Sequence, residues 1–327
     1  MSLSKLLVTG GEGLLGSAVI DAARDHYNCV STDVKSGDSQ GQFVALDLCN
    51  YEAVRTVMNS VRPRYVVHCG AISHPLRASR DPVETIGLNT VATANLLDIA
   101  HRIGVDGFVF ISSAAVYEGI CGLELVNESA ALAPRSIYAA SKVAAEAIVQ
   151  GYVGAFHFPA VILRPCSIYG AKRRTFSAPS FLVASALDGV NSELVDGGYG
   201  LDFVHVEDAA RAVLLALGAQ EATGKTFNIA TGVQVTYPLL AASVRRIIPG
   251  AQIFISAGDA DLGPEPRLDV SRARMDLGFT CKFGLDEGLA ELVDSFISAP
   301  YLKGIARLGA LNSGCKPFNL TGPLKAV

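Results

Sequence analysis

The chain has 327 residues, half of them hydrophobic, with a formal net charge of −4 and an isoelectric point near 5.9. This length can bury a full core, in one large domain or two interlocked ones. The weak acidity leaves no electrostatic footprint for nucleic acid or an anionic membrane surface, so we expect neither as a partner. No run of about 18 apolar residues is free of Gly, Pro or charge. The first apolar segment stops at Gly10, so we expect a soluble, cytoplasmic protein without a secretory signal.

The cysteines and histidines are scattered rather than clustered. The seven cysteines stand at positions 29, 49, 69, 121, 166, 281 and 315. This odd count contains no CxxC pair, and the six histidines form no HExxH motif. We therefore expect no disulfide and no metal site.

Residues 5–16 (KLLVTGGEGLLG) combine a hydrophobic strand, a glycine turn and the start of a helix. Gly10 can take a positive φ, Gly13 lets the backbone approach a pyrophosphate, and Gly16 allows close packing of helix on strand. The helix then points its free N–H groups at the phosphates. This pattern predicts a dinucleotide-binding turn.

The next predicted strand, residues 28–33, ends in Asp33, about 20 residues beyond the glycines. A Rossmann fold places at this point the acid that binds the ribose diol of the adenosine. A carboxylate there would repel the 2′-phosphate of NADP, so Asp33 favours NAD as cofactor. The nearby Lys35 is a weak argument for the opposite choice.

Short apolar runs alternate with helical segments along the first half of the chain. The predicted strands are residues 6–8, 29–32, 43–46, 65–69, 107–111 and 160–163. This alternation predicts an α/β fold, a Rossmann-type doubly wound parallel sheet with helices on both faces. Two long predicted helices, 83–103 and 138–152, carry many small or apolar residues, which suits a helix pair shared across a homodimer.

The alternation becomes irregular after Gly170, with Pro179 and the Gly- and Pro-rich segments 196–200 and 263–266. We therefore divide the chain into an NAD-binding domain at 1–170, with later returns near 201–232, and a smaller substrate-binding lobe mainly at 171–300. Residues 301–327 lack clear periodicity and are expected to form a C-terminal arm, extended or partly disordered.

Tyr138 and Lys142 stand four residues apart on the second long helix and so share one face. An ammonium beside a phenol stabilises the phenolate, and an oxidised nicotinamide would add a second positive charge, as a tyrosine general base requires. Ser112 and Ser113 follow a predicted strand at the sheet edge where ligands bind in open α/β folds. These residue types point to proton transfer at an alcohol or ketone.

These motifs together resemble the extended short-chain dehydrogenase/reductase family, which includes nucleotide-sugar epimerases and dehydratases, over roughly the first 298 residues. The matching segments are 9–16, Asp33, 47–48, 68–71 (HCGA), Asn89, 112–117 (SSAAVY), 138–142 (YAASK), 164–170 (RPCSIYG), 202–208 (DFVHVED), 227–230, 267–269 and 277–279.

The resemblance implies roles for particular residues. Tyr138 would be the general acid/base, Lys142 its partner and a ligand of the nicotinamide ribose, and Ser113 a hydrogen-bond donor to the reacting oxygen. The implied cofactor-binding residues are Gly10, Gly13, Leu14, Leu15, Gly16, Asp33, Asp47, Leu48, Gly70, Ala71, Asn89, Tyr138 and Lys142. An ordinary side chain-to-backbone hydrogen bond explains Asn89 equally well. The candidate substrate-binding residues are His74, Ser113, Ser167 and Arg267.

The departures from the family pattern bear on the reaction. Ala114 and Ala115 stand where sugar 4,6-dehydratases carry an Asp-Glu pair, which disfavours dehydration. Leu201 replaces an arginine that often meets the nucleotide diphosphate, and Ser167 replaces an asparagine. Arg173 and the adjoining Arg174 could supply compensating charge, although a solvated loop pair explains them as well.

Three functions remain open on the sequence alone. A nucleotide-sugar 4-epimerase-like enzyme is favoured narrowly, since Arg267 matches the family layout. An NAD-dependent dehydrogenase of a smaller sugar, sugar acid or hydroxy acid is favoured by Ser167 and Leu201. A cofactor-sensing regulatory protein is disfavoured, because a sensor has no need of the proton-transfer residues Ser113, Tyr138 and Lys142.

Overall fold

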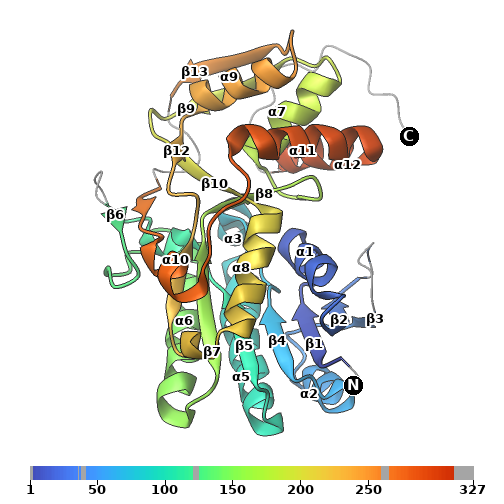
Figure 1. Cartoon of the computed structure of the whole chain (residues 1–327), viewed down its shortest axis with the longest axis vertical. Coiled ribbons are helices and arrows are strands. Elements are labelled where there is room, and N and C mark those ends of the chain that lie inside the picture. The colour runs from blue at the N-terminus through green and yellow to red at the C-terminus, as the bar shows by residue number, and fades with distance from the viewer. Residues whose placement is uncertain (1–2, 36, 38–41, 121–124, 259–264, 313–327) are drawn as a thin grey trace.

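A computed structural model describes residues 3–35, 37, 42–120, 125–258 and 265–312. Cys121, Cys315 and two residues of the predicted 263–266 turn, Gly263 and Pro264, lie outside these ranges. A large helix-covered sheet carries a smaller lobe above it (Figure 1). No helix in the described ranges is long and apolar enough to cross a bilayer.

The large sheet has seven strands, all parallel, in the order β11-β7-β5-β4-β1-β2-β3. Its strands are β1 (Lys5–Thr9), β2 (Asn28–Asp33), β3 (Gln42–Ala45), β4 (Tyr65–His68), β5 (Gly107–Ile111), β7 (Ala160–Pro165) and β11 (Thr226–Ile229). Helices cover both faces, so most strands are near-continuous apolar runs. The predicted Rossmann-type parallel sheet is confirmed.

Helices α1 (Leu14–Ala23) and α8 (Val206–Gly218) pack together on one face. The other face carries α2 (Tyr51–Val61), α5 (Ala92–Ile103) and α6 (Ile137–Phe156). Short helices complete this half: α3 (Pro75–Arg80), α4 (Pro82–Ile86), α10 (Ser271–Leu277) and the 3₁₀ turns Ala114–Tyr117 and Gln220–Ala222.

The predicted helix 83–103 is helical throughout, but it contains a π-helical turn at Gly87–Val91 between α4 and α5. The turn holds the buried Asn89, whose side chain accepts a hydrogen bond from the Ile72 N–H at 2.8 Å and donates one to its carbonyl at 3.0 Å. A π turn costs regularity and often marks a functional site. Here it aims an amide at the loop that follows β4.

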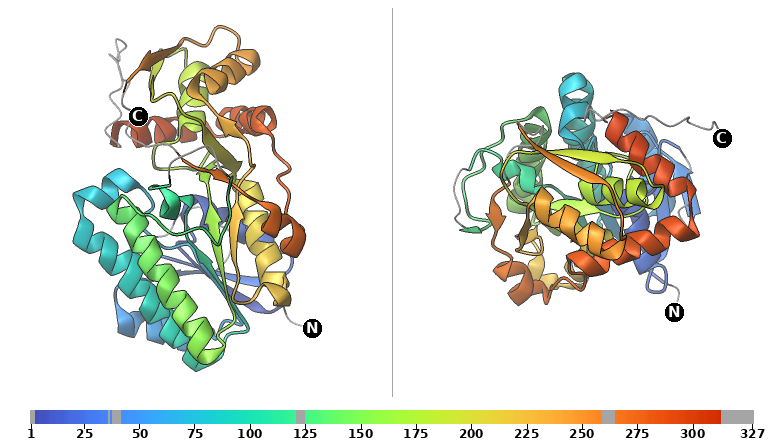
Figure 2. Two further views of the ribbon diagram at one scale, coloured as in Figure 1. Left: turned by 90° about the vertical axis from the view of Figure 1, so that its left-hand side faces the viewer. Right: turned by 90° about the horizontal axis from the view of Figure 1, so that it is seen from above.

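The smaller lobe contains α7 (Ala178–Leu187), α9 (Tyr237–Ile247), α11 (Leu285–Ser298) and α12 (Tyr301–Asn312) around its own apolar core. A three-stranded sheet joins β8 (Ser167–Tyr169), β10 (Leu201–His205) and β12 (Gln234–Val235). The parallel strand pair β9 (Ser192–Asp196) with β13 (Ile253–Ala257) belongs to the same lobe, whereas the pair β6 (Leu125–Val126) with β14 (Arg267–Leu268) packs on the core of the large sheet through Val126 and Leu268. Figure 2 shows this lobe from the side and from above.

The expectation for the C-terminal residues needs correction, and the predicted return at 201–232 divides between two sheets. Of the predicted return at 201–232, α8 and β11 join the large sheet, whereas β10 pairs with β8 and β12. Residues 301–312 form the helix α12 rather than an extended arm, because Leu302 and Ala306, four residues apart, bury their side chains in the core of the smaller lobe. The division of the chain at residues 170 and 300 stays a prediction.

Candidate active site

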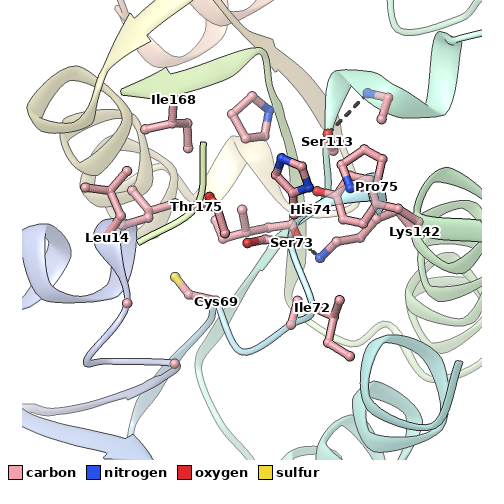
Figure 3. Close-up of a pocket in the computed structure, with 18 of the residues that line it drawn as sticks. Leu14, Cys69, Ile72, Ser73, His74, Pro75, Ser113, Lys142, Ile168 and Thr175 are labelled. Carbon is pink, nitrogen blue, oxygen red and sulfur yellow. Dashed lines mark hydrogen bonds between the residues drawn. The ribbon is translucent and has the colours of Figure 1, made fainter. Parts of the chain in front are cut away.

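A cavity of about 980 Å³ lies between the large sheet and the smaller lobe. The predicted site residues that line it are Gly10, Gly13, Leu14, Leu15, Gly16, Asp33, Asp47, Leu48, Gly70, Ala71, His74, Ser113, Tyr138, Lys142 and Ser167. In Figure 3, Leu14 stands on one side, Ser113 and Lys142 stand on the other, and Ser73 and His74 lie between them. Residues scattered over most of the chain thus meet at one place.

In the glycine loop, residues 10–16, neighbouring backbone atoms leave no space for a side chain at Gly10 or Gly16. Gly10 has φ +63°, and a Cβ there would lie 2.7 Å from the Gly70 nitrogen. A Cβ on Gly16 would lie 2.2 Å from the Gly10 carbonyl oxygen. Gly13 occupies the N-cap of α1 without a side-chain hydrogen bond, so the last three residues of this segment belong to the helix. The N–H groups at the start of α1 can therefore receive a phosphate of a dinucleotide.

Asp33 is held at the cavity edge by main-chain donors. Its Oδ2 accepts a hydrogen bond from the Glu12 N–H at 3.3 Å, and its Oδ1 accepts one from the Val34 N–H at 2.8 Å. This half-buried residue is the last of β2, next to the glycine loop. This position suits a ribose diol, so the residues present fit NAD.

Tyr138 lies in the first turn of α6 and is 7% exposed. Burial raises the pKa of its phenol, while a hydrogen bond with Ser113 and the positive charge of Arg173 lower it. The Ser113 hydroxyl comes from the end of β5 and also accepts a hydrogen bond from the Ala115 N–H at 3.2 Å. Phenol and hydroxyl therefore lie side by side in the cavity wall.

Lys142 lies one turn after Tyr138 and is 4% exposed. Its Nζ donates to the Ile111 carbonyl at 2.8 Å. Burial lowers the pKa of this ammonium to about 8, opposed by Cys69 and Glu146. The lysine was expected to act on the phenol, yet the cation that lowers the pKa of Tyr138 is Arg173.

Two predicted residues do not line the cavity. Asn89 lies behind the cavity wall. Its side chain accepts a hydrogen bond from the Ile72 N–H and donates one to the Ser141 Oγ at 2.9 Å, which joins the loop after β4 to α6. Arg267 is exposed on β14. The structure does not bring it to the other substrate residues, because the β6–β14 pairing sets the register of its strand outside the cavity wall.

Sequence reasoning gave too little weight to one residue and missed another. The sequence explained Arg173 equally well as a solvated loop residue, but its side chain is half-buried in the cavity wall. There its Nε donates to the Phe176 carbonyl at 3.2 Å and its Nη1 to the Ile168 carbonyl. Glu265, read as part of an irregular turn, also lines the cavity and accepts a hydrogen bond from the Ser167 hydroxyl at 3.0 Å. An acid between two prolines was the only sequence signal for it.

His74 caps α3 and is 6% exposed. Burial and the charges of Arg173 and Arg80 lower the pKa of its imidazole to about 4. The side chain is therefore neutral at pH 7 and lines the cavity as a polar group without charge. Within the described ranges, no group of three or more His, Cys, Asp or Glu residues is placed to hold a metal.

Comparison with known proteins gives the cavity its context. Residues 6–230 match the NAD dependent epimerase/dehydratase family. The chain belongs to this family. It is therefore an NAD-dependent enzyme, and the resemblance to extended short-chain dehydrogenases is confirmed.

Individual relatives cover nearly the whole chain. It is 27% identical to a UDP-glucose 4-epimerase of Mycolicibacterium smegmatis, over 89% of this chain and 98% of the relative. A dTDP-glucose 4,6-dehydratase of an Actinoplanes species is 28% identical, over 88% and 96%. The crystal structure of UDP-glucose 4-epimerase from Thermotoga maritima with UDP-glucose superposes with a TM-score of 0.84 at 25% identity, covering 90% of this chain and 99% of that one.

Proposed function

We propose that this enzyme inverts a secondary alcohol of a nucleotide sugar, most simply at C4, by removing and returning a hydride. The observation that carries the proposal is the meeting of Ser113, Tyr138 and Lys142 with the glycine loop in one cavity. The similarity to a UDP-glucose 4-epimerase over nearly its full length supports the same reaction class.

In the proposed mechanism the Tyr138 phenolate takes the proton of the reacting hydroxyl. Ser113 donates a hydrogen bond to the same oxygen and keeps it near the phenol. Lys142, anchored on the Ile111 carbonyl, would bind the ribose of the nicotinamide through its ammonium, and Arg173 lowers the pKa of Tyr138 through its charge. When bound, NAD supplies reversible hydride acceptance at the carbinol carbon.

Epimerisation follows if the ketone stays in the cavity and presents its other face before the hydride returns. Tyr138 then gives its proton back to the new alkoxide. Elimination of water is disfavoured, because Ala114 and Ala115 line the cavity beside Ser113 and offer no acid or base there. The nearby Glu118 accepts hydrogen bonds from the Ser136 N–H at 2.9 Å and its hydroxyl at 3.0 Å.

The cations available for an anionic substrate support a phosphate- or carboxylate-bearing sugar. Arg173 and Arg174 both line the cavity, the first half-buried and the second exposed. They provide positive charge on the substrate side, in place of the arginine that Leu201 replaces. A planar guanidinium binds phosphate and carboxylate oxygens well.

A second candidate is an NAD-dependent dehydrogenase of a smaller sugar, sugar acid or hydroxy acid. Leu201 in the cavity wall and Arg267 outside it favour this reading, because both reduce the positive charge available to a diphosphate. The catalytic residues would be the same. The difference is whether the ketone leaves before the hydride returns.

The test is incubation of the purified enzyme with nucleotide sugars and free sugar acids, with and without added NAD. Absorbance at 340 nm and product stereochemistry are followed together. Epimer formation without net NADH supports the epimerase. Stoichiometric NADH supports the dehydrogenase and overturns the primary proposal.

A further inference from the structure

One half-buried acid in the cavity wall, Glu265, has no part in the proposed proton transfer. Glu265 lies two residues before the start of β14, with Pro266 between them. Its Oε1 accepts the hydrogen bond from the Ser167 hydroxyl. Its Oε2 is buried and has no hydrogen-bond partner among the described residues. Native proteins rarely leave a buried polar atom unpaired, so such an atom at a cavity wall calls for a ligand.

The surroundings of Glu265 come from three further segments. Ser167 begins β8, Asp202 lies in β10, and Arg173 follows β8. Burial raises the pKa of the Glu265 carboxyl to about 7, and the Asp202 charge adds to this. Hydrogen bonds from the Ser167 hydroxyl and the Asp202 backbone, together with the charge of Arg173, oppose the rise. Above that pH the carboxylate carries an acceptor oxygen without a partner, and a hydrogen-bond donor from a ligand in the cavity would satisfy it.

The charge of the wall indicates which kind of donor fits. Arg173 is close enough to Glu265 that each affects the pKa of the other. An ammonium group on the ligand would be repelled by this guanidinium, whereas a neutral hydroxyl would not. Leu201 and Phe203, which stand on either side of Asp202 in β10, line the same cavity with apolar side chains.

We propose that Glu265 is a specificity-determining residue whose Oε2 accepts a hydrogen bond from a substrate hydroxyl other than the reacting one. Ser167 holds the carboxyl in place through Oε1. This inference rests on the proposed function, since it takes the ligand of the cavity to be a hydroxylated sugar substrate. A sugar that lacks this hydroxyl leaves the acid unpaired and binds weakly.

Calorimetric titration of UDP-glucose into the NAD-loaded enzyme tests the residue. We expect Glu265→Ala to weaken binding about 10- to 100-fold, and Glu265→Gln, which retains a neutral acceptor, to lie between. NAD affinity reports folding of both variants and should stay within twofold of wild type. Glu221→Gln, an exposed acid outside the cavity, is the matched control and should change neither constant.

Deoxy analogues locate the partner hydroxyl. UDP-glucose analogues lacking the 2-, 3- or 6-hydroxyl of the sugar, or the 2′-hydroxyl of the ribose, are titrated into wild type and Glu265→Ala. One analogue should bind wild type as weakly as Glu265→Ala binds UDP-glucose, and should lose nothing further in the variant. The free hexoses and UDP-glucosamine complete the panel.

Each outcome decides the inference. Binding of UDP-glucose to Glu265→Ala within twofold of wild type overturns it and leaves the proposed function standing. The inference is also overturned if wild type binds UDP-glucosamine more tightly than UDP-glucose and Glu265→Ala abolishes this preference, since the partner of Glu265 would then be an ammonium. Wild-type enzyme that binds no panel member overturns both proposals. Binding that depends on Glu265, with neither epimer nor NADH from any sugar, upholds the inference and overturns the proposed function.

Discussion

At the scale of single residues, the environment of Tyr138 decides what chemistry the cavity can perform. The phenol is buried, which raises its pKa, and it relies on Ser113 and Arg173 to oppose that rise. Lys142 donates a hydrogen bond to the carbonyl of Ile111, the last residue of β5, and this contact orients its side chain. The phenol and the Lys142 ammonium thus come from α6, while the Ser113 hydroxyl and the Arg173 guanidinium come from the segments after β5 and β8, and all four line one cavity.

Asp33 should set the choice between NAD and NADP. Its carboxylate can accept both ribose hydroxyls and repels a 2′-phosphate, so NAD should bind well ahead of NADP. Asp33→Ala should lose about 1.5 to 3 kcal/mol of NAD binding free energy, roughly one to two decades in affinity. The difference between NAD and NADP affinity should therefore become smaller. Fluorescence titration measures both constants. Equal or tighter binding of NADP by the wild-type enzyme would refute this role.

Glu265 should lower stability at alkaline pH. Its pKa in the fold, about 7, exceeds its ordinary value of 4.5. The folded state therefore binds more protons between these values, and the contribution of this group to the unfolding free energy falls as pH rises from 4.5 to 7. Glu265→Gln should gain about 1 to 3 kcal/mol over wild type at pH 8 and nothing at pH 4.

Urea unfolding at the two pH values measures this difference. The exposed Glu221→Gln serves as control and should match wild type at both. A Glu265→Gln variant that is no more stable than wild type at pH 8 would show that the carboxyl is not strained by burial. Paired with weaker substrate binding, the expected gain would mark a residue kept for function rather than stability.

At the scale of elements, α6 is the part that must not shift, because it carries both Tyr138 and Lys142. One turn beyond the lysine, Glu146 forms a two-point ion pair with Arg164 of β7, with Nε–Oε1 at 2.9 Å and Nη2–Oε2 at 2.6 Å. Both side chains are buried. The pair ties α6 to β7, the strand next to the β11 edge of the sheet.

Breaking this pair should be costly. Glu146→Ala leaves a buried guanidinium without its partner, and we expect a loss of about 3 to 5 kcal/mol of unfolding free energy. Asp276→Ala removes the carboxylate from the half-exposed Lys225–Asp276 pair and should cost less than about 1 kcal/mol. Denaturant titration compares the two. Equal losses would mean that burial adds nothing to the Glu146 contact.

The elements also show how far sequence reasoning reaches. The glycine loop, Asp33 and the Tyr138–Lys142 spacing were predictable because their geometry is local or follows the order of strands in a parallel sheet. The pairing of β10 with β8 was not, because short strands carry no signal of their partner. Glu265 and Arg267 stand two residues apart, yet only the acid reaches the cavity. Tertiary pairing decides such cases.

At the scale of the whole molecule, the cavity exists only where two parts of the fold meet. The glycine loop, Tyr138 and Lys142 come from the large sheet and its helices, while Ser167, Leu201 and residue 265 come from the segments leading to the smaller lobe. Substrate choice can therefore change with the second group while proton transfer stays with the first. This division is common among folds that support several reactions.

A homodimer remains our prediction for the assembly. The helical run from α4 to α5 leaves Val83, Ile86 and Val91 exposed, with Val83 82% exposed. If this run and α6 form a shared four-helix bundle, the protein is a two-fold dimer. Light scattering at micromolar concentration should give twice the chain mass. Val83→Glu should favour the monomer, whereas Met275→Glu on the exposed face of α10 should not.

The most direct test of the proposed chemistry is single-turnover hydride transfer by Tyr138→Phe at saturating NAD. The change removes one oxygen, keeps the ring in its packing, and deletes the only group proposed for proton transfer. We expect the rate to fall by about 10² to 10⁴ while NAD affinity barely changes. A rate within a few fold of wild type would mean that another residue is the base and that the assignment of Tyr138 is wrong.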